Sequence, residues 1–245
     1  MYRFFVEENR VGEREIRITG ADRNHIRNVL RMKPGERITV SSGQGLEYTC
    51  QISGYTEDAV VVEILSAREA GGELASKLWL FQGLPKGDKM ELIIQKAVEL
   101  GVYAVVPMAT KRAVVKLEGK KAEAKRSRWQ GIAESAAKQA KRMIIPQIYP
   151  VQSFKEAMTL AETLEVRLIP YEMAEHMAHT REVFSHIYPG QSVGIFIGPE
   201  GGFAPEEIEM AAAQQLQPVT LGKRILRTET AGLAVLSVLM YLLEE

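Results

Sequence analysis

The sequence predicts an α/β protein of two domains, in which a mostly β N-terminal region precedes a parallel sheet covered by helices. Residues 1–66 hold short runs of aromatic and β-branched residues, separated by Gly, Asn, Asp and Pro. Residues 77–108 predict a strand, a helix and a second strand, and residues 194–243 predict two strand-loop-helix units in succession. Since parallel strands end on one side of their sheet, we expect a ligand site there.

Composition and charge set the broad class. The 245 residues suffice for two ordinary domains, and 46% hydrophobic with 25% charged residues is typical of a soluble globular chain. The 31 basic residues balance 31 acidic ones, so the net charge does not suggest nucleic acid. The segment Lys111–Arg142, however, carries 11 Lys or Arg and 3 Glu, a net +8 that can attract phosphates. A solvated helix face is the alternative.

Cysteine usage and hydropathy predict a cytoplasmic protein with no membrane span. Cys50 is the single cysteine, which excludes an intrachain disulfide and favours a reducing compartment. The N-terminus has acidic residues by position 7 and lacks the apolar region of a signal peptide. The stretch Ala231–Leu243 is too short to cross a bilayer and predicts a buried helix.

The N-terminal region predicts a small barrel, because short strands that close on themselves form one. The expected strands are Tyr2–Val6, Glu15–Thr19, Arg37–Ser41, Leu46–Ser53 and Ala59–Leu65, with one helix at Asp22–Arg31. That helix carries arginines whose role is either phosphate contact or solvation. We expect His25 to cap the helix or to pack against its neighbours, since no second metal ligand accompanies it.

A linker follows at residues 68–76, which are polar and contain glycine, so we expect domains at 1–70 and 74–245. Lys77–Leu84, a helix ending at Gly101 and Tyr103–Met108 predict a right-handed βαβ unit. Further expected elements are a basic helix at Lys120–Arg142, strands at Gln147–Tyr149 and Val166–Pro170, and a helix from the cap Ser153 to Thr163.

Histidines near position 180 do not predict a metal site. His176, His179 and His186 have no cysteine or acid at ligand spacing beyond Glu182. We therefore expect no metal.

The stretch Gly194–Ala231 predicts the ligand site. A buried strand ends in the loop Gly198-Pro199-Glu200-Gly201-Gly202, where three glycines allow a ligand to approach the main chain. Pro205 predicts the first residue of a helix, with Glu207 as its capping acid. A strand at Val219–Leu221, a loop rich in Lys and Arg, and Thr228 as N-cap of the last helix follow. By itself the glycine loop also fits a tight surface turn.

The glycine loop together with Leu221-Gly222-Lys-Arg-Ile-Leu-Arg-Thr-Glu-Thr-Ala231 resembles the SPOUT methyltransferases, specifically the ribosomal small-subunit methyltransferase E family. The resemblance extends to Lys86–Glu91, to Gln95–Gly101 and to His25 with Val29-Leu30-Arg31, whereas Ser135, Lys138 and Lys141 depart from the family pattern. It implies methylation of N3 of a uridine in 16S ribosomal RNA with S-adenosylmethionine as cofactor. It also implies an N-terminal PUA-like β-barrel that binds RNA, a SPOUT α/β domain with a C-terminal trefoil knot, and a homodimer acting within the small ribosomal subunit.

The resemblance and the loop pattern give the candidate site residues. Main chain and apolar side chains suit an adenine and a thioether. The cofactor-binding candidates are Pro170, Tyr171, Ile197, Gly198, Pro199, Glu200, Gly201, Gly202, Leu221, Gly222, Ile225, Leu226, Arg227, Thr230 and Ala231. The RNA-binding candidates are Arg3, Arg23, His25, Arg31, Lys33, Lys86, Arg112, Arg128 and Arg142.

Arg227 and Glu200 are the candidate catalytic residues. Loss of the N3 proton leaves an anion spread over two uracil oxygens, which a guanidinium can stabilise. Which group takes the proton stays open between Glu200 and Glu229. Two alternatives also stay open: a ribose 2′-O methyltransferase of the same fold, and a non-catalytic RNA-binding protein. The chain has no Gly-x-Gly-x-x-Gly after an early strand and no Walker A sequence, which excludes the two commonest nucleotide-binding motifs.

Overall fold

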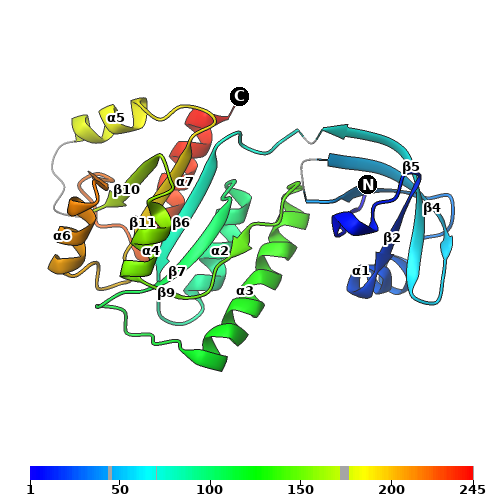
Figure 1. Ribbon diagram of the computed structural model, residues 1–245, viewed down its shortest axis with the longest axis horizontal. Helices are drawn as coiled ribbons and strands as arrows, with labels where there is room; N and C mark the ends of the chain where they lie inside the picture. Colours follow the sequence, from blue (N-terminus) through cyan, green and yellow to red (C-terminus); the bar gives the residue numbers. More distant parts are fainter. Residues whose placement is uncertain (44–45, 70, 172–176, 245) are drawn as a thin grey trace. The chain divides into compact units, whose positions relative to one another are not determined.

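The computed structural model describes residues 1–43, 46–69, 71–171 and 177–244 (Figure 1). The chain forms two compact units. Met1–Glu73 and Ala137–Ile145 make up the first, and Leu74–Ala136 and Pro146–Glu245 the second. The return of residues 137–145 to the first unit was not expected from the sequence, and the division at 1–70 and 74–245 stays a prediction.

The first unit is built on a five-stranded sheet in the order β1-β3-β4-β5-β2. Only β1 and β3 pair in parallel. The strands are β1 (Arg3–Phe5), β2 (Glu15–Thr19), β3 (Arg37–Ser41), β4 (Leu46–Tyr55) and β5 (Ala59–Glu69). All five expected strands are confirmed, because alternating apolar residues such as Ile16, Ile18 and Ile38 are fully buried between polar ones.

The helical segment of this unit differs from the expected helix at Asp22–Arg31. A short 3₁₀ helix η1 (Glu8–Arg10) precedes it, α1 spans Gly20–Asn24, and a π-helical turn η2 spans His25–Val29. Ile26 in this wider turn is fully buried in the core. Arg31 then adopts a φ of 52°, which ends the helix.

The returning segment is held to the first unit by Arg142 and Glu73. Arg142 is buried, and its Nε donates to both carboxylate oxygens of Glu73 at 3.2 and 3.1 Å. Glu73 also accepts from the backbone N–H of Met143 at 2.7 Å. Lys138 pairs with Asp22 at 2.8 Å. A buried guanidinium already paired with a carboxylate is poorly placed to meet a phosphate, and the expected RNA-binding role of Arg142 stays a prediction.

The second unit contains a seven-stranded parallel sheet in the order β12-β10-β11-β6-β7-β8, with β9 also paired to β7. The strands are β6 (Lys77–Gly83), β7 (Ala104–Ala109), β8 (Gln147–Ile148), β9 (Gln152–Ser153), β10 (Val166–Pro170), β11 (Ser192–Ile197) and β12 (Gln217–Val219). The expected parallel sheet is confirmed. The short strand β9 was not expected, and β12 lies earlier than expected, so that Thr220–Arg227 forms one long loop beside the site.

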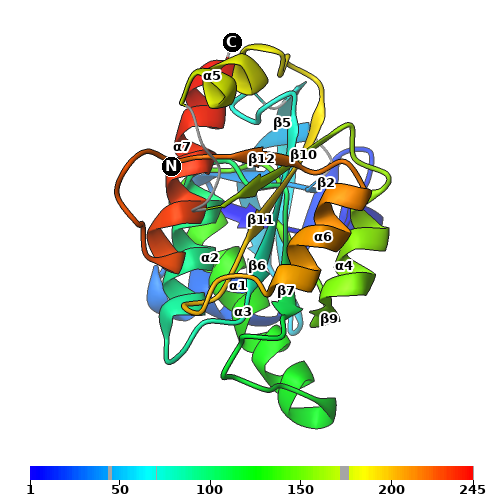
Figure 2. The ribbon, with the colours of Figure 1, turned by 90° about the vertical axis from the view of Figure 1, so that its left-hand side faces the viewer.

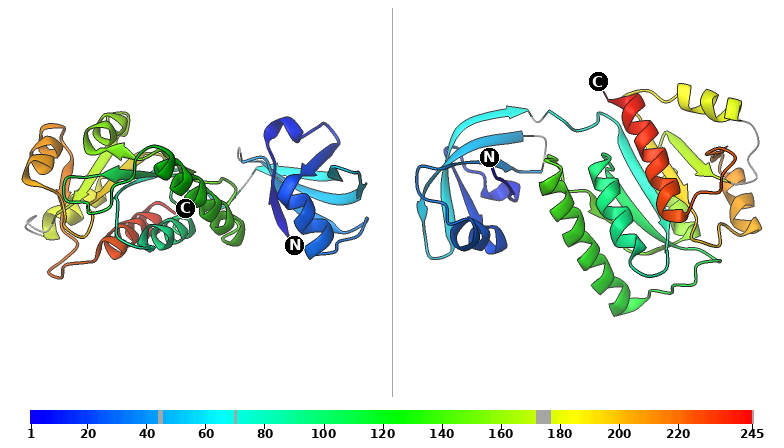
Figure 3. Two further views of the ribbon diagram at one scale, coloured as in Figure 1. Left: turned by 90° about the horizontal axis from the view of Figure 1, so that it is seen from below. Right: turned by 180° about the vertical axis from the view of Figure 1, so that it is seen from behind.

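Helices cover both faces of this sheet (Figures 2 and 3). α2 and α7 pack together on one face, and α4 and α6 lie on the other. The helices are α2 (Lys89–Glu99), α3 (Gly119–Gln139), α4 (Phe154–Ala161), α5 (Met177–Ser185), α6 (Pro205–Ala213) and α7 (Thr228–Leu243). α3 ends three residues before the expected position.

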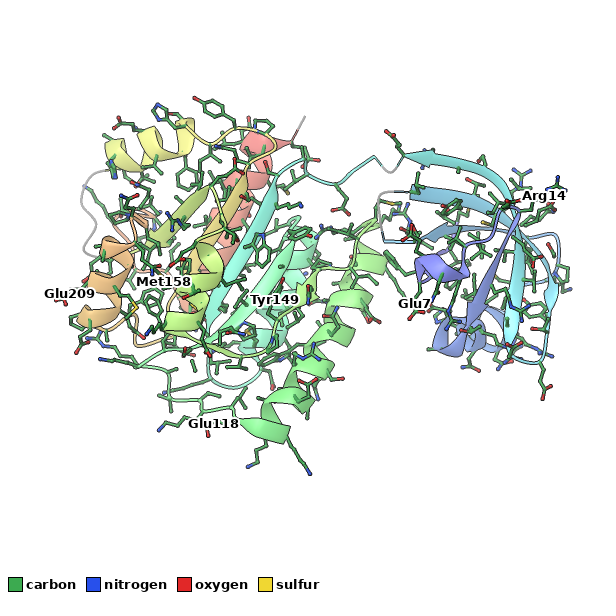
Figure 4. All side chains as sticks on the ribbon, viewed as in Figure 1. Glu7, Arg14, Glu118, Tyr149, Met158 and Glu209 are labelled. Atoms are coloured by element: carbon green, nitrogen blue, oxygen red, sulfur yellow. The ribbon has the colours of Figure 1, made fainter. Side chains whose placement is uncertain are left out.

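One hydrophobic cluster of this unit packs on the α4 and α6 face of the sheet. Phe81 and Phe196 stack at 4.3 Å between ring centroids, and Met158 of α4 is fully buried against the sheet (Figure 4). On the opposite face a Cβ at Gly232 would lie 3.3 Å from Leu80, so α7 approaches the sheet closely.

The helix starts test three capping predictions. Ser153 is the N-cap of α4, with the full capping box to Glu156, and Pro205 opens α6 with Glu207 accepting from the Ala204 N–H at 2.8 Å. Both are confirmed. Thr228 is not the N-cap of α7 but its first residue, following Arg227, because its hydroxyl bonds to another loop instead.

Two absences hold for the described part of the chain. Among its helices none is long and apolar enough to cross a membrane. No group of three or more His, Cys, Asp or Glu gathers as a metal site in the same residues, while His176 lies outside them.

Candidate functional site

A cavity of about 1120 Å³ opens at the carboxyl ends of β10, β11 and β12 in the second unit. It lies between the loop after β11, the loop after β12 and the first turns of α2 and α7. Ligands of parallel α/β sheets bind at such strand ends. The position agrees with the expectation from the sequence.

The cavity gathers the expected cofactor-binding residues with one exception. All of them line it except Thr230, which is exposed on α7. Eight further lining residues were not expected from the sequence, namely Lys89, Met177, Phe203, Pro205, Thr220, Lys223, Arg224 and Thr228. Arg112 also lines the cavity, although the sequence analysis named it only as an RNA-binding candidate. Most of the eight lie inside or next to the glycine loop or the segment Leu221–Ala231, so these two motifs could have predicted them. Lys89 comes from a different element, which no local pattern indicated.

Glycines shape the loop after β11 because its main chain folds back on itself. A Cβ at Gly198 would lie 3.0 Å from the carbonyl carbon of Gly202, and a Cβ at Gly83 would lie 2.7 Å from Pro199. Gly202 has a φ of +67° and donates its N–H to the Pro199 carbonyl at 2.9 Å. Larger residues would push the loop open.

Thr228 connects the two motifs. Its hydroxyl donates to the carbonyl of Gly198 at 2.6 Å and accepts from Nε2 of Gln82 at 2.9 Å. Gln82 is fully buried on β6, and its amide also donates to the carbonyl of Gly83 at 3.0 Å. The loop after β11, the start of α7 and the end of β6 are thereby fixed to one another.

A second connection is ionic. Nζ of Lys89 lies 2.9 Å from Oε1 of Glu200 and 3.3 Å from Oε2 of Glu229. Burial raises the pKa of Glu200, but the hydrogen bonds from Lys89 and from backbone N–H groups outweigh it and hold the pKa below its usual range. Glu200 is therefore a carboxylate committed to an ion pair and a weak proton acceptor.

Arg112 and Glu207 hold the opposite side of the loop. Glu207 is buried and accepts from the Lys111 N–H at 2.9 Å, which joins the end of β7 to the start of α6. Arg112 donates to the carbonyl of Gly201 at 3.1 Å. A Cβ at Gly201 would meet Cβ of Arg112 at 3.1 Å. Arg112 thus lies directly on the main chain of the loop.

Arg227 is exposed at the cavity, immediately before α7. In the described ranges no carboxylate pairs with its guanidinium, and Glu229 pairs with Lys89 instead. Simple pairing of Arg227 with Glu229 is therefore not observed. Among the described lining residues five are cationic, namely Lys89, Arg112, Lys223, Arg224 and Arg227, against the one acid Glu200. Such a rim suits an anionic partner.

The expected RNA-binding residues divide into exposed and engaged side chains. His25, Arg31, Lys33 and Lys86 are exposed. Arg3 is largely covered and pairs with Glu47 at 3.2 Å, Arg128 pairs with Glu91 at 2.8 Å, and Arg23 donates to the Thr56 carbonyl at 3.4 Å. Within the +8 segment Lys111, Lys125, Arg126 and Lys138 also pair with acids. These pairs reduce the local positive field.

Comparison with family models matches both units. A model described as an RNA methyltransferase domain matches residues 72–240, and one described as an RNA methyltransferase PUA domain matches residues 18–65. Ribosomal RNA small subunit methyltransferase E of Bacillus subtilis is 37% identical over 247 residues, covering 98% of this chain and 96% of the relative.

Solved structures agree over the full length. A ribosomal RNA small subunit methyltransferase E from Neisseria gonorrhoeae, bound to S-adenosyl methionine, has a TM-score of 0.84 at 32% identity and covers 99% of this chain and 98% of its own. A putative methyltransferase from Legionella pneumophila, in complex with the same molecule, also has a TM-score of 0.84 at 32% identity, covering 98% of this chain and 96% of its own.

We expect Thr228→Val to lower the free energy of unfolding by about 1–3 kcal/mol, because it removes a buried hydroxyl that donates to the Gly198 carbonyl and accepts from the fully buried Gln82 amide. Thr230→Val is the matched control, since Thr230 is exposed on the same helix. Urea denaturation followed by circular dichroism measures both. Equal stabilities of the two variants would show that the Thr228 bonds do not hold the loops.

Proposed function

The chain belongs to the ribosomal RNA small subunit methyltransferase E family, and from this membership we propose that it methylates N3 of a uridine in 16S ribosomal RNA. At the coarser level it is an S-adenosylmethionine-dependent rRNA methyltransferase with a PUA domain. The observation that carries the proposal is the cavity at the ends of β10, β11 and β12, where both motifs meet.

The lining fits S-adenosylmethionine. Ile197, Leu221 and Leu226 supply apolar contact, and the main chain of the glycine loop supplies hydrogen-bonding groups for an adenine. A Cβ added at Gly202 would meet no atom within 4 Å, so the loop leaves open space beside it. When bound, this molecule supplies a methyl group on a positively charged sulfur.

Arg227 supports the acceptor chemistry. Uridine N3 lies between two carbonyl groups, and its deprotonation spreads negative charge onto both oxygens. An exposed guanidinium at the cavity, with no carboxylate partner in the described residues, can donate to those oxygens. We assign this role to Arg227. We assign Glu200 to holding the loop, because its lowered pKa makes it a poor acceptor for the N3 proton.

The path of the chain supports the knot expected from the family. β12 lies at the edge of the sheet, whereas α7 packs beside α2 over β11 and β6 near its middle. Residues 220–227 cross between these places, and Thr228 is bonded to the loop after β11. We propose that this crossing completes a C-terminal trefoil knot and that the first unit closes as a PUA-like barrel.

Partners follow from charge and from exposed apolar residues. The cationic rim and the exposed His25, Arg31, Lys33 and Lys86 are proposed to contact 16S RNA within the small ribosomal subunit. On α7, Val238, Tyr241 and Leu242 are exposed. We propose that they form a homodimer interface and that the protein acts in the cytoplasm.

Ala231→Leu should weaken S-adenosylmethionine binding by about tenfold or more, because Ala231 lines the cavity and a larger side chain takes up ligand space. The matched variant Thr230→Leu lies one residue away outside the lining and should bind as the parent does. Calorimetry measures both affinities. A larger loss of affinity in Thr230→Leu than in Ala231→Leu would show that the ligand lies outside this cavity and contacts Thr230.

Arg227→Ala should slow methyl transfer by about 100-fold to 1000-fold in a single-turnover assay, while the cofactor affinity changes little. Arg227→Lys should recover only part of the rate, since an ammonium lacks the planar pair of donors. Arg224→Ala is the control, because Arg224 is an exposed arginine in the same loop. Equal rates for Arg227→Ala and Arg224→Ala would show that Arg227 contributes only general positive charge to the site and has no specific role in methyl transfer.

A further inference from the structure

We propose that Lys89 is a positioning residue, which fixes the two cofactor loops against each other by bridging Glu200 and Glu229. The inference rests on the proposed function, because the ligand that these loops hold is S-adenosylmethionine. It assigns a role to a residue on α2, outside both motifs.

The geometry joins three elements that are distant in the sequence. Lys89 is the first residue of α2, Glu200 lies in the loop after β11, and Glu229 is the second residue of α7. The Lys89 ammonium lies 2.9 Å from the first carboxylate and 3.3 Å from the second. All three side chains are at most about one-third exposed, at 32%, 30% and 16%. One side chain therefore connects both walls of the cavity.

The electrostatics of the helix start favour this arrangement. A lysine in the first turn of a helix faces the positive end of the helix dipole, which is unfavourable unless anions stand beside it. Glu200 and Glu229 supply those anions, and Glu200 also accepts from the N–H of Lys86 at 3.1 Å just before α2. The hydrogen bond with Glu200 raises the pKa of Lys89, so the bridge stays charged.

The glycine loop depends on such anchors. Thr228 holds it at Gly198 and Arg112 holds it at Gly201, and Glu200 lies between these two points. Without Lys89 the Glu200 and Glu229 carboxylates would lose the cation that they share and repel each other. A loop that must be ordered during binding lowers the affinity for its ligand.

Lys96 offers a matched control. It lies on the same helix, its Nζ is 2.9 Å from Glu99, and it is absent from the cavity lining. Loss of Lys96 removes one lysine and one ion pair from α2 without touching either loop.

The test measures S-adenosylmethionine affinity of the full chain by calorimetry. Lys89→Met should weaken binding by about tenfold or more, whereas Lys96→Met should stay within about twofold of the parent. Lys89→Arg retains the charge and should stay within about threefold. If Lys89→Met binds as tightly as Lys96→Met, the inference is overturned. A parent chain that binds no S-adenosylmethionine overturns the proposed function, and this inference with it.

Introducing Lys89→Met into a variant that lacks both carboxylates tests whether Lys89 positions the loops or contacts the ligand directly. In Glu200→Gln/Glu229→Gln the bridge has no charged partner, so adding Lys89→Met should cause no further loss of affinity. A further loss of about tenfold would mean that Lys89 contacts the ligand itself, which contradicts a positioning role. Circular dichroism of each variant confirms that the fold is intact, and Lys89→Arg provides a folded comparison if Lys89→Met is not.

Discussion

The Thr228 hydroxyl, placed between Gly198 and Gln82, is the interaction on which the arrangement of the site depends. The two loops that line the cavity come from opposite ends of the segment Gly194–Ala231 and share no strand. Thr228 is the first residue of the helix that follows one loop, and its hydroxyl donates to the Gly198 carbonyl of the other loop. Since the Thr228 hydroxyl and the Gln82 amide are buried and costly to leave without partners, their bonds favour one register of the loops over all others.

The charged side chains that the structure describes around the Thr228 hydrogen bonds fall into two groups, those paired inside the site and those left free at the cavity. Lys89 neutralises the acids inside the site, and Arg112 caps the carbonyl of Gly201. Arg227 is left at the cavity with no carboxylate partner in the described chain, together with the exposed Lys223 and Arg224. This combination suits the proposed transfer of a methyl group to RNA, in which the main chain holds a compact cofactor and free cations meet the polyanion.

Local patterns predicted most of the fold. The strands of both units other than β9 and β12, the capping box at Ser153 and the helix start at Pro205 are fixed by neighbouring residues, and they were expected correctly. The cofactor-binding candidates other than Thr230 line the cavity, whereas eight further lining residues were not expected.

The differences come from tertiary contacts that sequence spacing does not contain. Thr228 serves another loop instead of capping α7, Arg142 is buried against Glu73, and the segment Ala137–Ile145 returns to the first unit. The same holds for Lys89, whose partners lie more than 100 residues away. Charged residues are ambiguous in a sequence, because an exposed cation and a paired one have the same local pattern.

The most direct test of the account identifies the methylated atom. Small ribosomal subunits that lack the modification would be incubated with the purified chain and labelled S-adenosylmethionine. The RNA would then be digested to nucleosides and analysed by mass spectrometry. The account predicts label in N3-methyluridine from 16S ribosomal RNA. Label in a 2′-O-methyl nucleoside, or no transfer by a chain that binds both substrates, would contradict it.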